Sequence, residues 1–258
     1  MKEKIYTIPV TEAFGEAGEC PLCTLERKLE NEYTEYTLGP SLMEPDSRIQ
    51  TNDKGFCRHH FELLFNSPAN KLGLGLIIET MMAEQNERFN DFWSKKIPSI
   101  KNEAGMSTIK AAAGKLTARQ TETERFIDDM TKKLNEFENS CVICDKIAFT
   151  MDRYIDVTLY LWSKEPEFRQ LFNNCKGFCL PHMKDLLAGA KKYMEIRDMA
   201  SFVDTLIDMQ KTNLERIKGE VGWFNKKFDY RFANEPWGNS RDSIQRSIQK
   251  LSGYCRIG

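Results

Sequence analysis

The segments Cys20-Pro21-Leu22-Cys23 and Cys57-Arg58-His59-His60 decide how this chain folds, and their pattern returns as Cys141-Val142-Ile143-Cys144 and Cys179-Leu180-Pro181-His182. Between the two motifs lie 33 residues in the first copy and 34 in the second. Three thiolates and one imidazole complete a tetrahedral zinc site without an open position. We therefore predict two structural zinc ions per chain. The expected ligands are Cys20, Cys23, Cys57 and His60 for one, and Cys141, Cys144, Cys179 and His182 for the other.

The two copies agree well beyond these ligands. Lys54-Gly55-Phe56 returns as Lys176-Gly177-Phe178, Glu44-Pro45 with Arg48 returns as Glu165-Pro166 with Arg169, and Phe92-Trp93 resembles Trp223-Phe224. An internal duplication is the simplest account of such matches in nearly constant register. We expect two homologous halves in a pseudo-twofold arrangement, residues 1–115 and 116–258, with an exposed connector over 98–116 and a boundary near Lys115.

Hydrophobic periodicity predicts an all-α fold. Apolar residues recur every three or four positions over 21–38 and 142–162, and no segment alternates as a strand would. Longer amphipathic helices are expected over 71–95, ending before Pro98, and over 192–218, with another over 117–139. A last helix should run to about residue 251, capped by Asn239 or Ser240. Gly55 and Gly177 predict tight turns close to the metal.

Composition limits the classes of protein to which the chain could belong. Its 258 residues are 41% apolar, which suffices for real cores, and its net charge of −1 argues against a surface that coats nucleic acid or acidic membrane. The first residues lack the apolar core of a secretion signal, and no run approaches the roughly 20 apolar residues of a membrane span. We expect a cytoplasmic protein, where paired cysteines bind metal more often than they form disulfides.

Other readings of the cysteines and histidines stay open. An iron–sulfur cluster is the main alternative to zinc, although the long central spacing matches no ferredoxin pattern. Cys175, four residues before Cys179, is expected to pack as a small apolar residue, and its alternatives are a replacement ligand or a thiol near the metal. Cys255 receives no role. His59 is an alternative ligand to His60, but the match to His182 favours His60.

Two further groups of residues could form sites. Residues 211–258 contain ten Lys or Arg against five Asp or Glu, interleaved with aromatic residues, so Lys226, Lys227 and Arg231 could contact nucleic acid. Aromatic packing and hydrated cations explain this segment more simply. Glu44, Arg48, Glu165 and Arg169 could line a polar site between the halves, although ion pairs within loops are the simpler reading.

The sequence shows no catalytic constellation, since it lacks a Walker loop, a nucleophile elbow and a metalloprotease helix. Closed metal sites also disfavour hydrolytic zinc chemistry. We expect a binding or regulatory module for an unknown protein or small-molecule partner. A redox or oxygen-responsive iron–sulfur or thiolate protein is the second hypothesis, and a nucleic-acid-binding protein is the third.

Several longer motifs suggest a family. They are Glu19-Cys20-Pro21-Leu22-Cys23, Met43-Glu44-Pro45-Asp46, the Lys-Gly-Phe-Cys segments at 54–57 and 176–179, Lys226-Lys227-Phe228-Asp229-Tyr230-Arg231 and Pro236-Trp237-Gly238-Asn239-Ser240. Along nearly its full length the chain resembles a group of uncharacterised bacterial proteins, found mainly in anaerobic Gram-positive bacteria and grouped as a domain of unknown function. The resemblance implies no activity, substrate or catalytic residue, and it supports only the fold.

Overall fold

A computed structural model describes residues 4–68, 70–105 and 120–256, and its described residues form helices and no strand. The all-α prediction is therefore confirmed. The chain divides into two compact units: unit 1 comprises residues 1–30 and 147–258, and unit 2 comprises residues 31–146. Both divisions fall inside helices, α2 (Pro21–Leu38) and α8 (Val142–Lys164). The boundary expected near Lys115 lies outside the described residues.

The same order of helices follows each Cys-x-x-Cys motif. After α2 come α3 (Pro45–Lys54), α4 (Arg58–Asn66) and the long α5 (Lys71–Ala104). After α8 come α9 (Pro166–Asn174), α10 (Leu180–Tyr193) and the long α11 (Ile196–Lys226). The helices predicted over 21–38 and 142–162 are confirmed. This order agrees with an internal duplication, which stays a prediction together with its pseudo-twofold arrangement.

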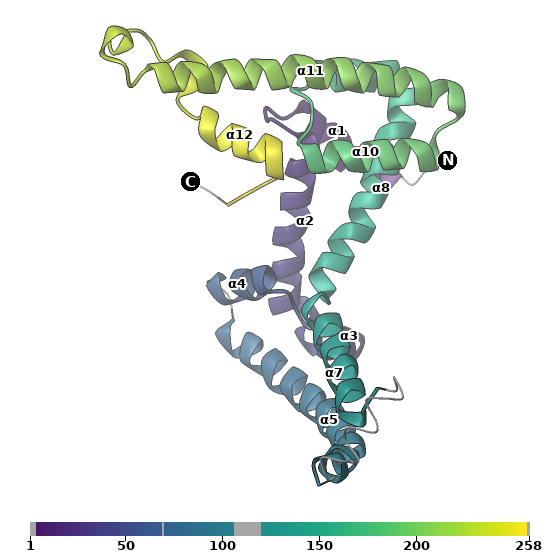
Figure 1. Ribbon diagram of the computed structural model, residues 1–258. Coiled ribbons are helices and arrows are strands. Elements are labelled where there is room, and N and C mark those ends of the chain that lie inside the picture. The colour runs from purple at the N-terminus through teal and green to yellow at the C-terminus, as the bar shows by residue number, and fades with distance from the viewer. Residues whose placement is uncertain (1–3, 69, 106–119, 257–258) are drawn as a thin grey trace. The chain divides into compact units, whose positions relative to one another are not determined.

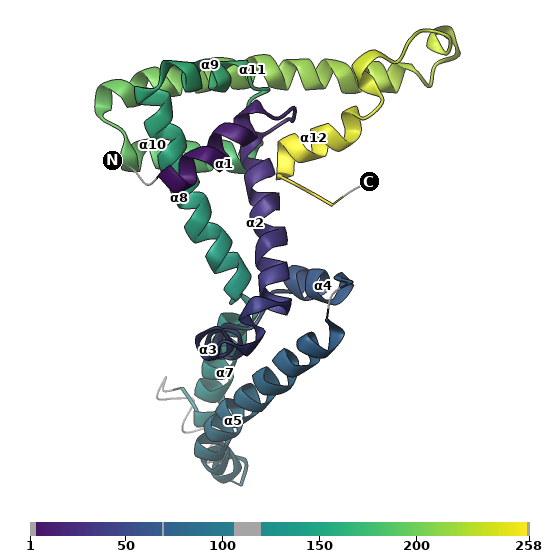
Figure 2. The ribbon, with the colours of Figure 1, turned by 180° about the vertical axis from the view of Figure 1, so that it is seen from behind.

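Unit 1 is built around an aromatic core. Phe14 on α1 (Lys4–Gly15) packs against Phe168, Phe172 and Phe178 with ring centroids 5.0 to 6.0 Å apart, and Phe172 also contacts Phe202 of α11. Figure 1 shows α10 and α11 side by side, with α12 (Ser243–Ser252) against α11, and Figure 2 shows α1 and α9 from behind. Such clusters stabilise through both burial and ring geometry. This packing holds the segment that carries Cys179.

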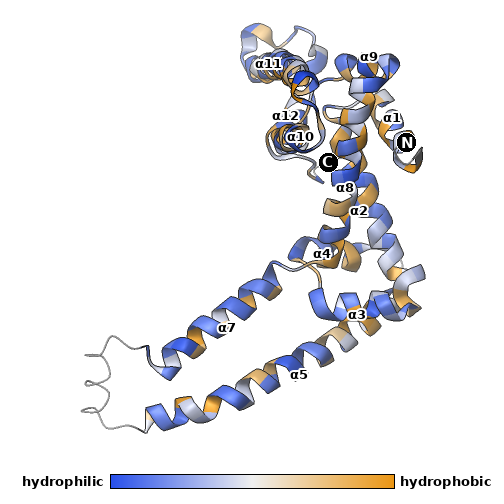
Figure 3. Cartoon of the chain, turned by 90° about the vertical axis from the view of Figure 1, so that its right-hand side faces the viewer, coloured by the Kyte–Doolittle hydropathy of each residue, from blue (hydrophilic) through white to orange (hydrophobic). Residues whose placement is uncertain are grey.

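Unit 2 has a smaller core. The helices α3, α4 and α7 (Glu122–Glu138) each pack against α5, which buries Leu74, Ile77 and Met81. No residue of α7 is buried, and Figure 3 shows this helix as mostly hydrophilic with isolated hydrophobic residues. The short helix η1 (Pro40–Met43) links α2 to α3. Unit 2 therefore gains less stability from apolar burial than unit 1 does.

The structure corrects several predicted helix boundaries. α5 does not end before Pro98 but continues to Ala104, where Glu103 accepts hydrogen bonds from the backbone N–H groups of Glu122 and Thr123 and so stabilises the paired ends of α5 and α7. α11 begins at Ile196 and reaches Lys226, beyond the predicted 192–218. The last helix begins after Asp242, because residues 238–240 form the separate short helix η3 (Gly238–Ser240). Helix α1, which contains Pro9, was not predicted.

Among the described residues, no helix combines the length and the apolar character that crossing a bilayer requires.

Candidate metal centres

Each Cys-x-x-Cys motif meets the Cys-x-x-His motif of the other copy. One cluster, named centre A, consists of Cys20, Cys23, Cys179 and His182; the other, centre B, consists of Cys57, His60, Cys141 and Cys144. All eight predicted ligands thus lie in two groups of three sulfurs and one imidazole. The predicted pairing within each copy is wrong, because the partners are exchanged. Centre A lies within unit 1 and centre B within unit 2.

Helix length gives the physical reason for this exchange. The 18 residues of α2 rise by about 27 Å, and the ten residues of α3 can recover only about 15 Å of that distance. Cys57 follows α3 and is therefore carried away from Cys20 and Cys23. The 23-residue helix α8 separates Cys144 from Cys179 in the same way. Two long helices thus oppose closure of a site within each copy.

In both centres, local backbone structure presents the ligands in the same manner. Cys57 and Cys179 are the N-cap residues of α4 and α10, so one helical turn carries the histidine back beside the sulfur. The predicted turns are confirmed, since Gly55 and Gly177 have φ values of 61° and 76°. A helix N-terminus favours thiolate over thiol, which is the form that binds metal.

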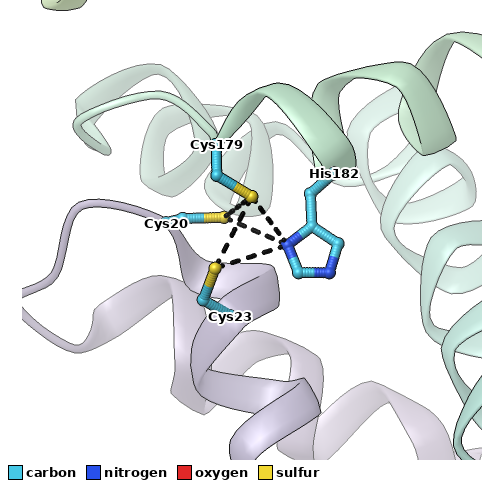
Figure 4. Close-up of side chains that lie close together, drawn as sticks. All are labelled: Cys20, Cys23, Cys179 and His182. Carbon is cyan, nitrogen blue, oxygen red and sulfur yellow. Dashed lines mark hydrogen bonds between the residues drawn. The ribbon is translucent and has the colours of Figure 1, made fainter. Parts of the chain in front are cut away.

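The side chains of centre A converge on one point. Figure 4 shows the three sulfurs facing the Nδ1 atom of His182. That nitrogen lies 3.1 Å from Cys179 Sγ and 3.5 Å from the sulfurs of Cys20 and Cys23, while Cys179 Sγ lies 3.9 and 3.6 Å from those two sulfurs. Tetrahedral zinc with usual bond lengths requires S–S edges of about 3.8 Å and S–N edges of about 3.6 Å. The donor set therefore fits a single zinc-sized ion.

Centre B has nearly the same dimensions. His60 Nδ1 lies 3.2 Å from Cys57 Sγ and 3.3 Å from the sulfurs of Cys141 and Cys144, and Cys57 Sγ lies 3.8 Å from Cys144 Sγ. His60, rather than its neighbour His59, completes this set. The same tetrahedral edges apply, so centre B also fits one ion.

Hydrogen bonds between neighbouring sulfurs shift the pKa values of cysteines in both centres, and these shifts suit the binding of a cation. In centre B, the hydrogen bond between Cys141 and Cys144 lowers the pKa of Cys141 to about 3 and raises the pKa of Cys144. In centre A, burial opposes ionisation of Cys20, but hydrogen bonds with Cys179, Cys23 and His182 lower the pKa of Cys20 well below its usual value. One sulfur in each centre thus ionises easily. Full deprotonation of all three requires a compensating metal ion.

The structure adds residues around centre A that sequence reasoning missed. Glu26 Oε2 lies 3.6 Å from His182 Nε2, on the side of the ring away from the sulfurs. A carboxylate in this place fixes the orientation of a ligating histidine. Glu26 lies one turn beyond Cys23 on α2, so its spacing could have identified it.

A buried lysine supports the backbone on both sides of centre A. Lys250 of α12 is 1% exposed, and its Nζ donates to the backbone carbonyls of Glu19 and Lys176. The buried carboxylate of Glu19 forms ion pairs with Arg216, Arg246 and Lys250. No local sequence pattern points to Lys250, because its partners come from distant parts of the chain.

The cysteines outside the centres behave as small side chains. Burial raises the pKa of Cys175 to about 11, and its sulfur lies 3.7 Å from the sulfur of Met209. This agrees with the packed thiol expected from the sequence. Cys255 lies near Ser252 and belongs to neither centre. All eight cysteines are described and none forms a disulfide.

The proposed polar site is split between the units. Glu44 and Arg48 lie in unit 2, whereas Glu165 and Arg169 lie in unit 1. Each glutamate is the N-cap residue of the following helix, and each arginine donates to a backbone carbonyl within its own unit. These roles are local and structural. A shared polar site stays a prediction.

The three cations proposed for nucleic-acid contact have different surroundings. Lys227 is buried and its Nζ donates to three backbone carbonyls between residues 232 and 235. Arg231 pairs with Asp229 at 2.6 Å, and Lys226 is exposed. Lys227 therefore organises the turn after α11. Nucleic-acid contact by Lys226, Lys227 and Arg231 stays a prediction.

Comparisons with known proteins place this chain in a family. The model of a family of unknown function, DUF6062, matches residues 1–257. A protein from Caldicellulosiruptor sp. (strain Rt8B.4), described as an uncharacterized 23.9 kDa protein in the xynA 3' region, is 27% identical over 99 residues. That match covers 38% of this chain and 49% of the relative, about half its length. No solved structure matches. The chain belongs to the DUF6062 family, whose function is unknown.

Proposed function

We propose that the protein is a cytoplasmic, zinc-stabilised helical module that binds a protein or small-molecule partner, with one zinc ion in each centre. The observation that carries this proposal is the pair of clusters in which three sulfurs and one nitrogen all lie within 4.8 Å of one another. A bound zinc ion would tie segments up to 162 residues apart in sequence. Its free energy of binding would then contribute to folding.

The geometry favours a single ion over a cluster. An iron–sulfur cluster distributes its cysteine ligands over several iron ions, so the sulfurs bound to different irons lie farther apart than the sulfurs of centre A. Zinc suits this donor set because it lacks a geometric preference of its own. Four protein ligands leave no position for a reactive water, so the role we propose is structural rather than catalytic.

Metal analysis of protein purified without oxygen tests this proposal. We expect a colourless protein with about two zinc ions per chain, and cobalt substitution should produce the intense charge-transfer and d–d bands of tetrahedral thiolate coordination. Stoichiometric iron and sulfide with broad visible absorption would replace the proposal with the redox alternative. Protein that folds fully without any metal would remove the structural role.

A further inference from the structure

The two centres differ in how far solvent reaches their ligands. In centre A, the exposed fractions of the four ligands range from 0% to 4%. In centre B, His60 and Cys141 are buried, but Cys57 is only half-buried and Cys144 is exposed. Cys23 and Cys144 are the second cysteines of equivalent motifs, so the same ligand position is buried in centre A and exposed to solvent in centre B.

The residues around the ligands also differ. Centre A has Glu26 against the far nitrogen of His182 and Lys250 joining the backbone beside two of its cysteines. The position equivalent to Glu26, three residues after Cys144, is Ile147, which has no carboxylate. The position equivalent to Glu19, just before Cys141, is Ser140 rather than a buried acid. The Cys-x-x-Cys segment of centre B thus carries no counterpart of Glu26 or Glu19.

From these differences we propose that the centres are unequal: centre A holds its zinc permanently, whereas centre B exchanges zinc with competing soft ligands through Cys144. This inference rests on the proposed function, since it requires zinc in both centres. The competitors are thiols, thiol-rich proteins or chelators, whose donor atoms can reach the Cys144 side of the cluster. Zinc-site exchange depends on such access, because an incoming donor has to approach the ligand that leaves.

Loss of metal from centre B should loosen unit 2 alone. Centre B joins α4 to the start of α8, across separations of 81 to 87 residues. Unit 2 has a small core and α7 buries no residue, so little else replaces this cross-link. Unit 1 retains its aromatic core and centre A. Zinc availability would therefore control the order of unit 2 while unit 1 stays folded.

Zinc release from the full-length protein tests the inequality. In one reaction, zinc-loaded protein is mixed with excess EDTA without oxygen. In a matched reaction, 4-(2-pyridylazo)resorcinol replaces EDTA, and the absorbance of its zinc complex follows the release. We expect one ion to leave at least about ten times faster than the other, the lower end of the effect of outer-shell support on zinc affinity. Alkylation with N-ethylmaleimide at the end of the fast phase should label Cys57, Cys141 and Cys144 and leave Cys20, Cys23 and Cys179 protected.

Matched variants assign the two phases. Cys144→Ser should abolish the fast phase, and Cys23→Ser should abolish the slow phase. If Cys23→Ser does not fold, the labelling pattern of the unaltered protein still shows which centre loses its zinc first. Release of both ions at one rate, or earlier labelling of centre A, would overturn the inequality. Failure of the proposed function is distinguishable, because the starting protein would then lack two zinc ions before any chelator is added.

Discussion

The exchanged pairing of the ligands makes a prediction that metal content alone can test. Replacing Cys57 with serine should remove the zinc of centre B, which also contains Cys141 and Cys144, and leave centre A filled. The variant should therefore hold one zinc ion. Adding Cys144→Ser should remove no further zinc, because both changes affect one centre. The double variant of Cys57→Ser and Cys23→Ser should hold no zinc, because these residues belong to different centres.

The structure also sets the size of the stability effect. Centre B closes a loop of 81 to 87 residues, and the chain-entropy model for cross-links gives about 4.5 kcal/mol for a loop of this length. Centre A closes a loop of up to 162 residues, worth about 5 kcal/mol. Cys57→Ser should therefore destabilise unit 2 by at least about 4 kcal/mol, a large fraction of the stability of a typical domain.

Two assays read out these effects. Inductively coupled plasma mass spectrometry of gel-filtered protein counts the zinc, and hydrogen exchange locates the loosened unit. In Cys57→Ser, peptides of unit 2 should exchange faster while peptides of unit 1 keep their protection. The reasoning is refuted if the double variant of Cys57 and Cys23 keeps one zinc while that of Cys57 and Cys144 keeps none. That result would show that each copy closes its own site.

Three further predictions concern single residues of unit 1. Glu26→Gln should weaken zinc binding at centre A by about 10- to 100-fold, measured by chelator competition, with no change at centre B. Lys250→Met keeps the aliphatic stem but removes the buried amine, so two backbone carbonyls lose their hydrogen-bond donor. The free energy of unfolding of unit 1 in urea should fall by about 2 kcal/mol or more. An unchanged unfolding curve would contradict the supporting role of Lys250. Gly177→Ala should lower stability by about 1–2 kcal/mol, because φ is 76° and the new Cβ would lie 3.0 Å from a side-chain oxygen. The control Gly219→Ala lies in a helix with open space around it and should be neutral or stabilising by calorimetry.

Local sequence patterns determined much of this protein. The helix over 21–38 followed from apolar spacing, and its observed limits agree with the prediction. The turns at Gly55 and Gly177 followed from the residue type, and the type and number of candidate metal ligands followed from two repeated motifs. All these features depend on residues within a few positions of each other, where the geometry of a helix or turn is the main constraint. The continuation of α5 past Pro98 was missed, because it depends on Glu103 contacting the start of α7.

Only the tertiary structure decided which motifs meet in each candidate metal centre. The two Cys-x-x-Cys motifs offer the same donor atoms, as do the two Cys-x-x-His motifs, so ligand chemistry cannot distinguish one pairing from the other. Packing makes the choice: Phe14 joins the aromatic core beside Cys179, and α2 carries Cys57 away from Cys20. The buried support from Lys250 and the exposure of Cys144 likewise depend on distant segments. Residue spacing records local geometry, whereas these features arise from contacts that form only when the whole chain folds.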